Sequence, residues 1–168
     1  MNLELIDNNL YTINQISVKK ETLPMKKLIL VIFINLLLIP ASFARDDIGS
    51  YAIADALAIE EYKNLLGNEI RFYFGTNKPK NIQKIYGEFG TNKKTNAFNK
   101  TDKAACQRAF ISALISLRDR ALREGGNAVI NVKSNYKGTL TSDNTTFRCG
   151  AGAIMAGVAL VGTVAQVK

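Results

Sequence analysis

Residues 101–132 read TDKAACQRAFISALISLRDRALREGGNAVINV, and this stretch decides the fold. Its apolar side chains recur at three- and four-residue steps, at Cys106, Ala109, Phe110, Ala113, Leu114, Leu117 and Ala121. That spacing predicts an amphipathic helix of about six turns with one face against a sheet. Thr101 or Asn99 can cap its start, and the glycine pair at 125–126 can end it in a left-handed conformation. A buried strand is predicted directly afterwards, over residues 127–132.

Shorter elements flank this helix and strand. Before them, the pattern predicts a short helix around 56–66, a strand over 70–74 and a second strand that begins at 85–89 and can run on to 95. After them, strand character resumes over 145–149, and the glycine-containing segment 150–167 predicts one or two further strands. Of the polar stretches between these elements, 76–83 is predicted as a basic loop, and 133–144 is turn-rich. This order predicts an α+β fold in two layers, with the long helix packed on a mostly antiparallel sheet.

The composition excludes several classes of chemistry. The 168 residues include 22 Lys and Arg against 14 Asp and Glu, two Cys and no His. Without His, Ser-His-Asp and Cys-His catalysis are excluded, and two Cys alone cannot build a Cys/His zinc site. We therefore expect neither a metal nor a cofactor. The excess of basic residues points instead to anionic partners.

The N-terminal segment has the layout of a secretory signal peptide. Met25-Lys26-Lys27 is positively charged, residues 28–38 form an apolar run, and Ser42-Phe43-Ala44 offers a small-x-small cleavage site. The apolar run is short for a bilayer span, so an uncleaved membrane anchor is the less favoured alternative. We therefore predict that residues 1–24 are a gene-model extension or leader, that 25–44 are the signal peptide, and that 45–168 form a single mature domain exported to the periplasm.

The order of the elements brings the two cysteines together. A helix over 101–124 is about 36 Å long, and the strand that follows, running to about residue 136, returns along it. The start of the next strand then lies near the beginning of the helix. Cys106 is in the second turn of that helix and Cys149 is a few residues into that strand, so we predict a disulfide, which export permits. The alternative is two buried free thiols.

Five blocks of the sequence carry a family resemblance: Lys93–Phe98 (KKTNAF), Ala105-Cys106, Ala113–Ile115, Glu124–Ile130 (EGGNAVI) and Cys149–Leu160 (CGAGAIMAGVAL). They resemble a family of small exported bacterial proteins that are often labelled excinuclease ATPase subunits. More distantly, the long helix, the GGNAVI block and the Cys-bearing final strands are similar to the YbjQ-like fold and to the RcsF-like signalling domain of envelope stress sensors. The RcsF-like sensors are lipoproteins with four cysteines, whereas this chain has two and no lipid-attachment Cys.

The ATPase label can be tested on the residues. A phosphate-binding loop ends in Gly-Lys-Ser/Thr, but the segment at 90–95, GTNKKT, has no Gly before the Lys. In the segment from Gly150, Met155 stands where a dinucleotide fingerprint requires its third glycine. Nucleotide hydrolysis is therefore excluded.

Eight basic residues lie in the loops and strands before the long helix and in its first turns: Lys78, Lys80, Lys84, Lys93, Lys94, Lys100, Lys103 and Arg108. We expect this basic cluster to bind an anionic envelope polymer, a lipid headgroup or a protein partner, and the alternative is a solvated surface. Nucleic acid is not an expected partner of an exported protein, and membrane contact is expected only through the transient signal peptide. The predicted function is a non-catalytic periplasmic binding protein, with envelope stress as one setting. Two alternatives remain open: a small enzyme based on carboxylates or on Lys and Tyr, and a redox sensor that uses Cys106 and Cys149.

Overall fold

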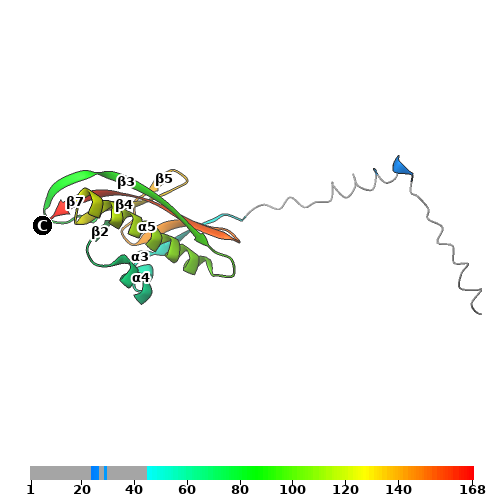
Figure 1. The fold of residues 1–168 in the computed structure, drawn as a ribbon, viewed down its shortest axis with the longest axis horizontal. Helices are drawn as coiled ribbons and strands as arrows, with labels where there is room; N and C mark the ends of the chain where they lie inside the picture. The colour runs from blue at the N-terminus through cyan, green and yellow to red at the C-terminus, as the bar shows by residue number, and fades with distance from the viewer. Residues whose placement is uncertain (1–23, 27–28, 30–44) are drawn as a thin grey trace, which may run out of the picture. The chain divides into compact units, whose positions relative to one another are not determined.

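The structure is a computed structural model that describes residues 24–26, 29 and 45–168 (Figure 1). The chain divides into two units, Met1–Ser42 and Phe43–Lys168, and the second is described here by itself. The predicted leader and signal peptide fall almost wholly outside the described residues and stay predictions. Among the residues that are described, none of the helices has the length and hydropathy of a membrane span.

The elements of the folded unit follow one another as β1 (Asp47–Ala52), α3 (Ile53–Leu57), α4 (Glu60–Leu66), β2 (Arg71–Phe74), β3 (Ile82–Asn96), α5 (Asp102–Glu124), β4 (Ala128–Tyr136), β5 (Thr139–Thr141), β6 (Thr146–Ala151) and β7 (Met155–Val167). The strands form one sheet in the order β1-β6-β7-β4-β2, with β3 on β7 and β5 on β4. Every pair is antiparallel except β2 with β4. Figure 1 shows α5 running along the long strands β3 and β7. The predicted α+β fold is confirmed.

The long helix forms where the sequence predicts it. The Thr101 hydroxyl accepts a hydrogen bond from the Ala104 N–H, which satisfies one of the free donors at the start of α5. Asp102 in the first turn places a negative charge at the positive end of the helix dipole. At the other end Gly125 adopts the left-handed conformation, with φ 78°, and its N–H bonds back to the last turn.

Strand β7 packs at the centre of the sheet beneath α5. Val158, Leu160 and Val164 face the helix and are buried in the main core. A Cβ at Gly162 on the same face would lie 2.6 Å from Val129 Cγ1, so only glycine fits between β7 and the core side chains there. Of the segment 150–167, the first two residues end β6, a short turn follows, and β7 is one long strand.

The predicted helix around 56–66 is wrong in detail. The helix predicted around 56–66 is two short helices, α3 and α4, because the backbone is extended at Ile59 (ψ 119°). The turn-rich stretch 133–144 holds the end of β4, a tight turn and the short strand β5. Strand β1 was not predicted at all, and it forms by pairing along its whole length with β6.

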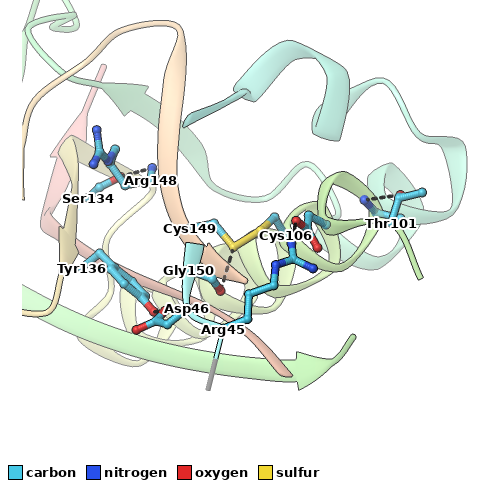
Figure 2. Close-up of a disulfide and its surroundings, with 11 residues drawn as sticks. Arg45, Asp46, Thr101, Cys106, Ser134, Tyr136, Arg148, Cys149 and Gly150 are labelled. Atoms are coloured by element: carbon cyan, nitrogen blue, oxygen red, sulfur yellow. Dashed lines mark hydrogen bonds and ion pairs between the residues drawn. A yellow bond between two sulfur atoms is a disulfide. The ribbon is translucent and has the colours of Figure 1, made fainter. Parts of the chain in front are cut away.

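The predicted disulfide is confirmed. Figure 2 shows the Cys106–Cys149 bond joining α5 to β6. The two Cα atoms lie 5.8 Å apart, and both residues are fully buried. The bond therefore ties the second turn of the helix to the strand that carries β1 on one side and β7 on the other.

Asp143 organises the turn before β6. Its Oδ1 atom accepts hydrogen bonds from the N–H groups of Thr145 (2.7 Å) and Thr146 (2.9 Å) and from the Thr145 hydroxyl (2.9 Å). These donors favour the carboxylate, so they lower the pKa of Asp143 from 3.8 to about 2.

We expect the turn at Asp143 to make stability depend on pH in the acid range. A carboxyl group whose pKa is lower in the folded state stabilises fully above its unfolded pKa, here near 3.8, and loses this effect as pH falls through about 2. Asp143→Asn keeps an acceptor oxygen without the charge, so it should unfold at lower urea than the wild type at pH 6. The difference should shrink at pH 2, and an equal difference at both pH values would contradict the assignment.

Candidate functional site

A pocket of about 670 Å³ opens on the sheet face opposite α5. In β7 the side chains of Val158 and Leu160 point toward the helix, so Gly157 and Ala159 lie on the other face, where they line the pocket. The walls come from the segment that leads into β1, the far end of β3, the turn after β4 and the turn between β6 and β7.

A pair of glycines forms part of the pocket floor. Gly150 of β6 and Gly157 of β7 are directly opposite each other in the sheet. A Cβ at Gly150 would lie 1.7 Å from the Tyr136 hydroxyl oxygen, and one at Gly157 would lie 3.5 Å from Lys94 Cγ. The missing side chains leave room for the Tyr136 ring, which Figure 2 shows beside Gly150.

Tyr136 and Lys137 both contact the carboxylate of Asp46. The Tyr136 hydroxyl donates to Asp46 Oδ1 (3.1 Å), and the Lys137 ammonium forms an ion pair with Asp46 Oδ2. Lys137 and Gly138 have φ values of 52° and 80°, as the two-residue type I′ turn between β4 and β5 requires. A left-handed conformation costs a non-glycine residue about 1–2 kcal/mol, so Lys137 holds its position at the pocket against a local preference.

Of the two other cations in the pocket, Arg45 has carboxylate partners and Lys94 has none among the described residues. The Arg45 guanidinium forms ion pairs with Asp47 and with Asp102 in the first turn of α5. Lys94 takes part in none of the ion pairs between described residues. The lining therefore holds three cationic side chains and a single carboxylate, that of Asp46, and the charge of Lys94 is the one left for a ligand.

The pKa shifts in the pocket favour binding over acid–base chemistry. The hydrogen bond with Lys137 lowers the pKa of Asp46, and the same contact raises the pKa of Lys137. Burial, followed by the hydrogen bond to Asp46, raises the pKa of Tyr136. Each shift moves a pKa further from neutrality, whereas a general acid or base works best with a pKa near the working pH. Asp46 and Lys137 therefore keep their charges, and Tyr136 stays a neutral hydroxyl.

The eight residues of the predicted basic cluster do not gather on one surface. Lys84 and Lys94 lie near opposite ends of β3, about 33 Å apart at the usual rise of a strand. Lys78 and Lys80 are in the loop that leads into β3, so they lie toward the Lys84 end. Lys93 and Lys100 are near the Lys94 end.

The other two members of the basic cluster are neutralised by carboxylates. Lys103 pairs with Asp55 (2.6 Å) and Arg108 contacts Glu61 (3.9 Å). Of all eight, only Lys94 lines the pocket.

The sequence analysis did not select the pocket residues Arg45, Asp46, Tyr136 and Lys137. A partial signal for Lys137 was present, because the glycine that follows it supplies the positive φ that a tight hairpin turn requires. Comparisons of the chain with protein-family models, with curated proteins and with solved structures found no match in any of the three. The site is therefore interpreted from its own geometry.

We expect Gly150→Ala to destabilise the domain through Tyr136. The new Cβ would occupy the position of the Tyr136 ring, and such overpacking typically costs about 1–3 kcal/mol. The same substitution in a Tyr136→Ala background should cost less, because the ring is no longer there. Urea unfolding of the wild type, the two single variants and the double variant measures this coupling, and equal costs in both backgrounds would show that Tyr136 does not rest on Gly150.

Proposed function

We propose that this domain is an exported binding protein whose pocket takes an anionic amphiphile of the bacterial envelope. The observation that carries the proposal is an apolar floor beside cationic side chains, one of which, Lys94, has no carboxylate partner among the described residues. A carboxylate or phosphate head at Lys94 would restore the balance of charge in the pocket.

The size and lining of the pocket support a ligand with a short apolar part. Its volume of about 670 Å³ lies within the usual range of small-molecule sites. It equals roughly twenty water molecules at about 30 Å³ each, which suits a head group with a single chain. Ala153, Ile154, Met155 and Ala159 supply apolar surface for that chain.

The disulfide supports the exported setting. Bonds of this kind persist in oxidising compartments, and the resemblance to exported bacterial proteins agrees with the periplasm. Cys106 and Cys149 are fully buried, while regulatory disulfides are typically exposed or strained, so burial favours a structural role over redox sensing. Envelope stress, as in the RcsF-like sensors, is one setting in which such a ligand would be detected.

Calorimetric titration with decanoate, a single-chain carboxylate, tests the proposal. We expect Lys94→Glu to weaken binding at least tenfold, because the substitution places a negative charge where the head group binds. Lys84→Glu makes the same change of charge near the other end of β3 and serves as the matched control. Equal effects of the two substitutions, or equally tight binding of the cation decyltrimethylammonium, would overturn the proposal.

A further inference from the structure

Three large apolar side chains are exposed together where β3 ends and β7 begins. Phe98 is 70% exposed, Ile154 66% and Met155 49%, and we name these three residues the apolar tip. The Ala97 N–H donates to the Ile154 carbonyl oxygen (2.7 Å), and Asn96 is paired with Met155 in the sheet. The two segments that carry the apolar tip are therefore held side by side by the backbone.

Uncompensated cations lie within a few residues of the apolar tip along the chain. Lys93 and Lys94 lie on β3 within three residues of Asn96, and Lys100 follows Phe98 by two residues, with its ammonium on the Asn96 carbonyl oxygen (3.0 Å). None of these three lysines takes part in an ion pair between described residues.

Four carboxylates of this part of the domain each contact a cation. Asp47 and Asp102 pair with Arg45, Asp55 pairs with Lys103, and Asp46 pairs with Lys137. Asp47 and Asp102 share the one charge of Arg45, so the three lysines that are unpaired among the described residues and these ion pairs together hold six cations against four carboxylates, a net charge of +2.

We propose that the apolar tip docks this domain on an anionic phospholipid surface. Phe98, Ile154 and Met155 would enter the boundary between headgroups and acyl chains, and the three lysines would face the lipid phosphates. The Phe98 ring is exposed outside the pocket lining, and Ile154 and Met155 keep about half or more of their surface exposed although they also line the pocket. A fluid lipid surface accommodates separate protruding side chains, whereas a protein partner must supply a matching cavity for each.

Docking in this way would place the pocket at the membrane. Ile154 and Met155 belong to the apolar tip and also line the pocket, so the pocket lies next to the docked surface. On the basis of the proposed function, the domain would take its amphiphile from the lipid layer. Docking itself depends only on the apolar tip and the lysines.

Cosedimentation with two kinds of vesicle tests the inference. One kind is phosphatidylcholine alone and the other is phosphatidylcholine mixed with phosphatidylglycerol. We expect the protein to bind the anionic vesicles, and Phe98→Ser with Ile154→Ser to weaken that binding at least tenfold. The matched control is Ile85→Ser with Leu140→Ser, which removes two apolar side chains of similar exposure (60% and 61%) elsewhere. Because both double variants carry the same N-terminal segment, any membrane affinity of residues 28–38 cancels in the comparison.

The outcomes separate docking from the pocket function. Equal loss in both double variants, equal binding to neutral vesicles, or binding of a protein in place of lipid through Phe98 and Ile154 would overturn docking. Decanoate binding by the unaltered protein is measured in parallel. Decanoate binding without vesicle binding would overturn docking and leave the pocket function standing. Vesicle binding that needs the apolar tip, without decanoate binding, would support docking and overturn the pocket function.

Discussion

Replacing Cys106 and Cys149 by alanine is expected to lower the free energy of unfolding by about 4 kcal/mol. The bond joins residues separated by 43 positions, and in the chain-entropy model its main effect is to restrict the unfolded chain. Both positions are fully buried in the main core, where alanine fits with little loss of packing. Urea unfolding of the oxidised wild type and the double variant measures the difference.

The single variant Cys149→Ala provides the internal control for the disulfide. It breaks the same bond, so it should lose about as much stability as the double variant, and so should the wild type after reduction. Stability within about 1 kcal/mol of the oxidised protein in all three cases would show that the closed loop contributes little, against the chain-entropy estimate.

Phe110→Ala is expected to cost about 3–5 kcal/mol, the usual range for a buried phenylalanine. The Phe110 ring is fully buried and stacks on Phe147, with ring centroids 4.0 Å apart and planes inclined by 9°. It also lies 6.0 Å from the ring of Phe74, so it joins α5 to β6 and β2. Removing it leaves a cavity between the helix and the sheet, which urea unfolding at neutral pH would detect.

Phe98→Ala is the matched control for Phe110→Ala. The residue type and the substitution are the same, but Phe98 is largely exposed, so stability should change by no more than about 0.5 kcal/mol. Similar losses for the two variants would mean that the core does not centre on the Phe110 and Phe147 stack.

The parts of the fold that the sequence predicted are those whose determinants lie close together in the chain. The cap at Thr101, the apolar face of α5 and the stop at Gly125 all belong to one stretch, so periodicity and capping are sufficient to place the helix. The disulfide followed from the length of that helix and the direction of the next strand. The helix and the disulfide could both be predicted because each depends on the geometry of α5 and of the strand that directly follows it.

Strand β1 could not be predicted in this way. Its sequence, DIGSYA, has two residues of high strand propensity and no regular alternation. It is a strand because Gly49 and its neighbours pair with Cys149 and the rest of β6, about a hundred residues later. The break at Ile59 is a tertiary effect as well, since the local residues favour one continuous helix.

The candidate site was harder to predict because its residues come together only in the folded sheet. Asp46 meets Lys137 across 91 positions of the chain, and Arg45 meets Asp102 across 57. The predicted basic cluster holds residues that are close along the chain, so Lys84 and Lys94 were expected to share one surface. An extended β3 separates those two by most of its length, and only Lys94 lies at the pocket.

The pairing of β3 along β7 has a consequence for how copies of the protein behave at high concentration. Among the described residues, β3 has β7 as its one partner, so its outer edge offers fifteen residues of backbone to any strand that meets it. If the β3 edges of two copies paired, Lys84, Lys93 and Lys94 of the two strands would repel one another. The register shift beside Gly87 also bends the edge, so it is less suited to pairing with another strand. The lysines of β3 thus also protect the domain against fibrous aggregation.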